Sequence, residues 1–156
     1  MKITFAPRDI LQIDDARIVY RNFSGAPSKF NREGDRNFAV VISDQQIADE
    51  LVEQGWNVKI RPARDEGDTP FIYLPVKVKF NDRGPNIYLQ SGRNRNRLDE
   101  ETVGMLDHID ILNVDLDIRP FDWEVNGKTG RTAYLQSICV TQDVDRFDQD
   151  DDPSMY

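Results

Sequence analysis

Few residues in this chain could carry covalent or metal chemistry. The 156 residues include one cysteine, Cys139, and one histidine, His108. A structural zinc site usually takes four Cys or His ligands, and an intramolecular disulfide needs a second cysteine, so this chain can make neither alone. We expect Cys139, between Ile138 and Val140, to be a buried structural thiol, and His108 to have a surface or capping role.

Motifs for nucleotide-dependent, hydrolytic or metal-dependent catalysis are missing from the sequence. It has no P-loop, GxGxxG, GxSxG or HExxH pattern. The pair Asp143 and Asp145 resembles the start of a calcium loop, but the glycine and glutamate that such a loop requires do not follow. We therefore expect no enzymatic activity, no cofactor and no metal.

The basic residues are concentrated in two segments of a chain whose net charge is −8. Residues 17–37 hold five bases and two acids, and residues 77–97 hold six bases and one acid. Residues 143–156 hold six aspartates and one arginine. This asymmetry predicts that the basic segments of the body bind an anionic partner and that the chain ends in a short acidic interaction tail. We divide the chain into one domain, 1–142, and a disordered acidic tail, 143–156.

Two predicted strands present lysine and arginine at every second position, with Lys59 and Arg61 on one and Lys77 and Lys79 on the other. A positive groove with flat side chains between the charges can hold the phosphates and stack the bases of a single-stranded nucleic acid. Tyr20 is one stacking candidate. The residues that we predict to contact nucleic acid are Arg21, Phe23, Lys29, Phe30, Arg32, Arg36, Lys59, Arg61, Tyr73, Lys77, Lys79, Tyr88, Arg93, Arg95 and Arg97.

Structural explanations compete with this interpretation. Lysines on the solvent face of an edge strand also prevent aggregation, which accounts for many basic rows. Trp56 and Trp123 share the phase of core residues, so we expect both to pack in the interior. The segment from Arg93 to Arg97 is too polar for a core and rich in arginine, which makes it the strongest functional segment.

The elements expected to position these residues are short strands. Alternation and apolar runs predict strands at 17–23, 38–43, 56–61, 72–80, 87–90, 111–118 and 134–141. A helix begins near Asp44 and ends at Gly55, and a second follows the 92–97 loop, with Asp99 as its cap. Pro120 predicts an edge or bulge, and Asn126-Gly127 predicts a tight hairpin. Such a pattern fits a small β-barrel or sandwich with two short inserted helices. No apolar run is long enough to span a membrane, and no signal peptide is visible.

The chain resembles phage-encoded single-stranded DNA-binding proteins. The likeness covers residues 17–141 and rests on Tyr20-Arg-Asn-Phe-Ser-Gly25, Gly55-Trp-Asn-Val-Lys59, Trp123-Glu-Val-Asn-Gly-Lys128 and Ala133-Tyr-Leu135. It implies a mainly β, oligonucleotide-binding (OB) barrel that acts in DNA replication or recombination, in the cytoplasm of the infected bacterial host.

The tail is similar to the acidic, aromatic-tipped ends of these proteins. Asp150, Asp151, Asp152, Pro153 and Tyr156 are in the matching positions, which implies that the tail recruits replication or recombination proteins. An acidic run with such a tip could also fold back onto the chain's own basic groove and compete with DNA.

We therefore expect a sequence-tolerant single-stranded DNA-binding protein that is a monomer or a dimer. The net charge of −8 supports an alternative, an acidic DNA mimic that blocks a host enzyme. A small nuclease is a third reading, although the metal-ligand pattern for it is missing. One comparison of binding to single-stranded DNA, duplex DNA and RNA separates these functions.

Overall fold

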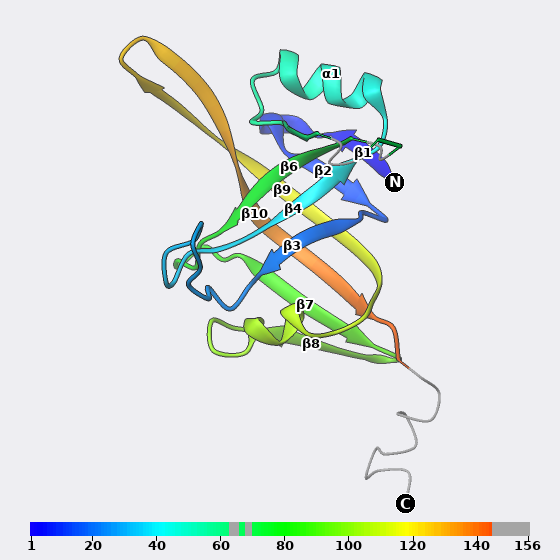
Figure 1. Ribbon diagram of the computed structural model, residues 1–156. Coiled ribbons are helices and arrows are strands. Elements are labelled where there is room, and N and C mark those ends of the chain that lie inside the picture. The colour runs from blue at the N-terminus through cyan, green and yellow to red at the C-terminus, as the bar shows by residue number, and fades with distance from the viewer. Residues whose placement is uncertain (63–65, 68–69, 145–156) are drawn as a thin grey trace, which may run out of the picture.

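The computed structural model describes residues 1–62, 66–67 and 70–144, and β-strands dominate it (Figure 1). This confirms the prediction of a mainly β protein. The helical elements in these residues are one α-helix, α1 (Gln45–Glu53), and two 3₁₀ helices, η1 (Pro7–Asp9) and η2 (Val103–Asp107). The strands are β1 (Lys2–Phe5), β2 (Leu11–Asp14), β3 (Ile18–Asn22), β4 (Arg36–Ile42), β5 (Lys59–Arg61), β6 (Phe71–Val78), β7 (Asn86–Ser91), β8 (Asn94–Leu98), β9 (Ile111–Val125) and β10 (Lys128–Gln142).

The strands form one sheet in the order β1-β2-β9-β10-β6-β4-β3, with β5 beside β6 and β8 beside β7. β10 is antiparallel to β9 and parallel to two strands on its other edge, β6 at Ala133–Tyr134 and β7 at Ser137–Gln142. A register shift between Leu135 and Ser137 separates the two parallel pairings. Because β6 and β7 follow one another along β10, both belong to one curved surface. Within the described residues the two end strands, β1 and β3, do not pair with each other, so the barrel is open.

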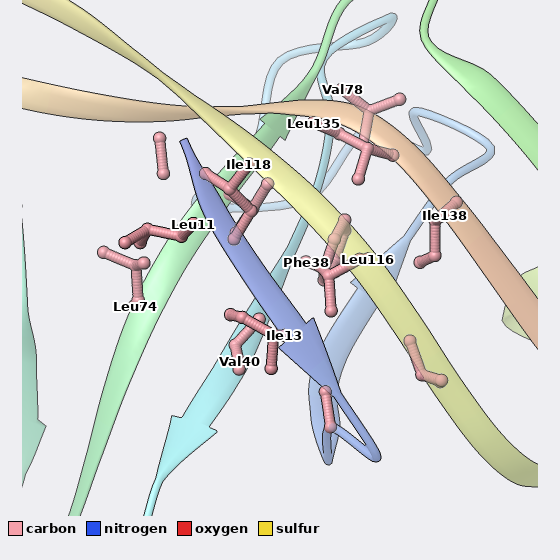
Figure 2. Close-up of a cluster of buried hydrophobic side chains, with 14 of the residues drawn as sticks. Leu11, Ile13, Phe38, Val40, Leu74, Val78, Leu116, Ile118, Leu135 and Ile138 are labelled. Carbon is pink, nitrogen blue, oxygen red and sulfur yellow. The ribbon is translucent and has the colours of Figure 1, made fainter. Parts of the chain in front are cut away.

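One face of this sheet forms the core. Leu11 and Ile13 of β2 point inward with side chains of β4, β6, β9 and β10 (Figure 2). Because side chains alternate along a strand, the residues between the buried ones lie on the opposite side, which we call the outward face. The buried residues of the central strands are Phe38, Val40, Ile42, Leu74, Val76, Val78, Val114, Leu116, Ile118, Ala133, Leu135, Ile138 and Val140.

The first predicted helix is confirmed with its caps. The Asp44 carboxylate accepts hydrogen bonds from the backbone N–H groups of Gln46 and Ile47 at 2.8 and 3.4 Å. The chain leaves the helix at Gly55, whose φ of 92° glycine adopts without strain. The helix lies at one end of the sheet (Figure 1), and none of the described helices is long and apolar enough to cross a bilayer.

The hairpin at Asn126-Gly127 is also confirmed, and both residues have the positive φ of a type I′ turn, 51° and 79°. β9 continues through Pro120, which lies beyond the residues of β9 that pair with β2. Residues 121–132, which we call the arm, form a two-stranded ribbon that projects from the body (Figure 1).

Four local predictions are wrong. The expected 92–97 loop is a turn followed by β8, which pairs with β7. The second inserted helix is the short 3₁₀ helix η2, although Asp99 does accept hydrogen bonds from the N–H groups that follow it. Regular strand in the predicted 56–61 element begins only at Lys59, and Ile60 is 66% exposed because it lies on the short edge strand β5. Trp56 is buried as expected, whereas Trp123 is 39% exposed.

Candidate nucleic-acid interface

A hollow of about 790 Å³ lies where β3, β4, β6 and β10 meet the loop around Phe30, and we call it the sheet groove. It brings together six of the fifteen predicted contact residues, although they come from four separate segments of the chain. These are Phe30, Arg36, Lys59, Tyr73, Lys77 and Lys79. Tyr20, Phe80 and Tyr134 also line it.

Three aromatic rings gather at the β3–β6 part of this surface. Tyr20 contacts Tyr73 edge-on with ring centroids 5.6 Å apart, and Phe71 lies 6.3 and 5.8 Å from the two tyrosines. Tyr20 has a φ of 54° at an irregularity in the β3–β4 pairing, and it is 50% exposed. Arg61 fixes the cluster, since its guanidinium donates to the Tyr20 hydroxyl at 3.0 Å and lies over Phe71.

Three exposed lysines supply positive charge along the groove. The strand register pairs Lys59 with Tyr73 and Lys77 with Tyr134, so each of these lysines lies opposite a tyrosine of a neighbouring strand. Lys79 follows directly after β6. Among the described residues, Arg36 and Arg131 are the only cations in ion pairs. No carboxylate in this part of the chain therefore pairs with the three lysines.

Hydrogen bonds from the Asn31 side chain to backbone carbonyls hold the loop around Phe30, which displays that ring. The Asn31 amide donates to the carbonyls of Ala26, Arg32 and Asp35 at 2.9 to 3.0 Å. Phe30 is 91% exposed, and the Lys29 ammonium lies 5.7 Å from its ring centroid. Arg32 is also exposed in this loop. An apolar ring held in water beside a cation is available for a stacking partner.

Three predicted contact residues have structural roles. Phe23 is a correction, because it is fully buried and stacks on Phe38 at 5.1 Å, so its ring cannot reach a base. Arg21 donates to the carbonyls of Leu106 and Ile109 at 2.7 and 2.8 Å and thereby holds η2 against β3. The third, Arg36, lines the groove but donates to the Phe23 carbonyl and pairs with Glu100.

The remaining predicted residues lie on the β7–β8 hairpin, outside the groove but on the outward face. Register places Tyr88 between Cys139 of β10 and Arg97 of β8. The Arg95 guanidinium lies over the Tyr88 ring at 4.4 Å, and Arg97 donates to the Asn86 side chain at 2.7 Å. Arg93 is exposed in the turn. Cys139 is half-buried on this face, so the expectation of a fully buried thiol is corrected.

The prediction from sequence missed Tyr134 and Arg119, which connect the groove to the arm. The Arg119 guanidinium lies over the Tyr134 ring at 5.2 Å, and Phe121 contacts the same ring at 5.8 Å. Tyr134 enters the groove through the parallel pairing of β10 with β6. A parallel pairing between distant segments leaves no local signal in the sequence.

The resolved pKa shifts belong to positions outside the groove. A hydrogen bond from the Thr102 hydroxyl, followed by backbone N–H donors, lowers the pKa of Asp99. A hydrogen bond from Arg131 lowers the pKa of Asp122, and that bond in turn raises the pKa of Arg131. In the described part of the chain, no three His, Cys, Asp or Glu side chains are grouped to hold a metal. The predicted tail residues Asp150, Asp151, Asp152, Pro153 and Tyr156 lie outside the described residues.

Comparison with known proteins identifies a family and a fold. A family model described as a putative phage ssDNA-binding domain matches residues 2–152. The single-stranded DNA-binding protein of bacteriophage Enc34 is similar in structure, with a TM-score of 0.58 and 13% identity over 94% of this chain and 93% of that chain. The same protein in complex with ssDNA gives 0.54 and 15% over 93% of each chain. No curated protein sequence matches the chain.

Proposed function

This chain belongs to the family of phage single-stranded-DNA-binding domains, and on that premise we propose that it binds single-stranded DNA without reading its sequence. The observation that carries the proposal is the sheet groove, where three exposed lysines, none of them in an ion pair within the described residues, line one hollow with the exposed rings of Tyr20 and Phe30 and the half-buried ring of Tyr73. Phosphates would pair with the lysines while bases stack on the rings, and neither contact depends on base identity.

The charges on the outward face suggest a path for the strand. Asp115 and Asp117 occupy this face of β9, opposite Cys139 and Ser137 of β10. Their carboxylates repel phosphates, so we expect a strand that leaves the groove toward β10 to turn to the β7 side, where Arg95 and Arg97 are exposed. This path would join the two basic segments.

A binding comparison tests the proposed function against its alternatives. Labelled oligo-dT, duplex DNA and RNA of equal length are titrated by fluorescence anisotropy. The proposal expects tight binding of oligo-dT that weakens steeply as salt rises, because phosphate contacts release counterions. A DNA mimic would retain none of the three and would instead bind a basic host enzyme. Loss of labelled strand on addition of magnesium would identify a nuclease.

Phe30 allows a sharp test of stacking, because its ring is 91% exposed and supports no core residue. We expect Phe30→Ala to weaken oligo-dT binding by about 1–3 kcal/mol without changing stability. Phe5→Ala on β1 is the matched control, since Phe5 is a 39% exposed phenylalanine at the far end of the strand order from β3. Equal affinities of the two variants would remove Phe30 from the interface.

The β7–β8 arginines have their own test. Replacing Arg93, Arg95 and Arg97 together with alanine should weaken binding of oligo-dT, oligo-dC and a mixed sequence by the same factor. Phosphate contacts have this property, whereas contacts with base edges would make the losses unequal. Unchanged affinity for all three strands would confine the interface to the sheet groove.

We place this activity in DNA replication or recombination of a phage inside its bacterial host, on the basis of the family. The acidic tail is proposed to recruit other replication or recombination proteins, and its charge suits a basic partner surface. A pull-down that compares full chain with a chain ending at residue 142 tests the recruitment. Equal capture of a replication protein by both forms would contradict it.

A further inference from the structure

The arm carries apolar side chains that the core does not use. Phe121, Trp123 and Val125 are 52%, 39% and 58% exposed. They occupy alternate positions of β9, and no register shift separates them from Arg119, so all four lie on the outward face. Clustered apolar exposure on a projecting ribbon indicates a binding surface.

This face of the arm continues the sheet groove. Tyr134 lines the groove and also contacts the Phe121 ring edge-on, with centroids 5.8 Å apart. Trp123 lies two residues further along β9, about 7 Å at the usual rise of a strand. A cation lies at each end of the row formed by Tyr134, Phe121 and Trp123. Arg119 lies over the Tyr134 ring, and Lys128 pairs with Val125 near the tip of the arm.

Trp123 lies across the backbone of β10 at the residue it faces, Gly130. A Cβ at position 130 would overlap Cζ2 and Cε2 of the Trp123 indole, so only glycine lets the ring occupy this position. One side of the indole is therefore supported by the strand while the ring is 39% exposed. A supported ring that is open on its other side suits a stacked base.

The opposite face of the arm is tied to the body. Arg131 pairs with Asp122 at 2.7 Å and with Asp9 at 3.3 Å, and its guanidinium lies over Trp56 at 5.3 Å. This cluster fixes the base of the arm and neutralises Asp122. The aromatic face is thereby held in place, away from that carboxylate.

We propose that the arm is a second part of the DNA-binding surface, in which Trp123 stacks on a base where the strand passes Tyr134 and Phe121, at the end of the groove opposite the β7–β8 arginines. This inference rests on the proposed function and extends it. It makes the binding mode depend on strand length, because a short strand fills the groove alone and a longer one also reaches the arm.

Tryptophan fluorescence tests the inference, because the chain has two tryptophans and Trp56 is only 3% exposed. The full chain is titrated with oligo-dT strands of about 4 to about 16 nucleotides, the range of site sizes seen for OB folds. Anisotropy of an end label reports binding independently. We expect quenching of the emission by the longer strands but not by the shortest, and loss of that quenching in Trp123→Phe.

Two further variants separate stacking from folding. Gly130→Ala keeps the indole but displaces it, and Trp123→Ala removes it. Both should weaken binding of the longest strand about tenfold while the shortest binds as before. Val52→Ala on α1, an equally exposed valine outside the groove and the arm, should leave both affinities unchanged.

The outcomes distinguish this inference from the proposed function. Tight binding of long strands without quenching overturns the role of the arm and leaves the groove intact. Emission that changes with protein concentration in the absence of DNA would make the arm a contact between copies, which also overturns it. Failure to bind any strand rejects the proposed function and the arm together.

Discussion

The three exposed lysines of the sheet groove give the most quantitative prediction. The variant is Lys59→Ala, Lys77→Ala and Lys79→Ala in one chain. Each cation that neutralises a phosphate of a single strand contributes about −0.7 to the slope of log K against log salt, so the slope should become shallower by about 2. Between about 50 and 200 mM salt, wild type should then lose about 20-fold more affinity than the variant does.

The assay is anisotropy of labelled oligo-dT at four or more salt concentrations, with thermal unfolding to show that the fold is intact. Because these side chains are exposed and make no ion pair within the described residues, the variant should unfold as wild type does. Lys2→Ala on β1 is the control, and its slope should be unchanged. A wild-type slope in the triple variant would refute the assignment of phosphates to the groove.

Three further predictions concern the rest of the chain. Arg21→Ala should lower the free energy of unfolding by about 2–3 kcal/mol in urea titration, because two charge-assisted hydrogen bonds are lost, and equal stability would contradict the role in holding η2. Deleting residues 143–156 should tighten oligo-dT binding or leave it unchanged, and weaker binding would argue against competition by the tail. Because the pKa of Asp122 is lowered in the folded chain, the ionised Asp122 carboxylate stabilises the fold at pH values above the pKa that this group has in the unfolded chain. This stabilisation is lost as the pH falls through the lower pKa of Asp122 in the folded chain. Asp122→Asn should therefore show less acid destabilisation below about pH 4 than wild type, whereas identical acid curves would show that Arg131 contributes nothing there.

Local patterns predicted the elements that depend on local chemistry. The cap at Asp44, the positive φ at Gly55 and the Asn126-Gly127 turn each follow from the backbone preferences of one or two residues. The strand at 94–98 was missed because alternating arginine and asparagine have no hydrophobic phase. Its pairing with β7 supplies the regularity that its side chains lack.

The sequence indicated which kinds of residue belong to the candidate site, but it did not indicate how they come together on one surface. Alternation identified Lys59 and Lys77, and Tyr73 was chosen as an aromatic residue near them. The proximity of all three to Tyr134 depends on the parallel pairing of β6 and β10. Phe23 was misassigned because a polar loop follows it, whereas its own ring packs on Phe38 in the core. Polar residues next to a position indicate that the backbone there runs along the surface, but they do not determine whether the side chain at that position points inward or outward.

Photocrosslinking tests the central claim most directly, namely that a single strand lies on the outward face of the sheet. Oligo-dT containing bromodeoxyuridine is crosslinked to the full chain, and the modified peptides are mapped by mass spectrometry. We predict adducts on Tyr20, Phe30 and Tyr73, with Tyr134 where the strand crosses β10. Adducts confined to α1, β1 or β2, with these rings unmodified, would contradict the account.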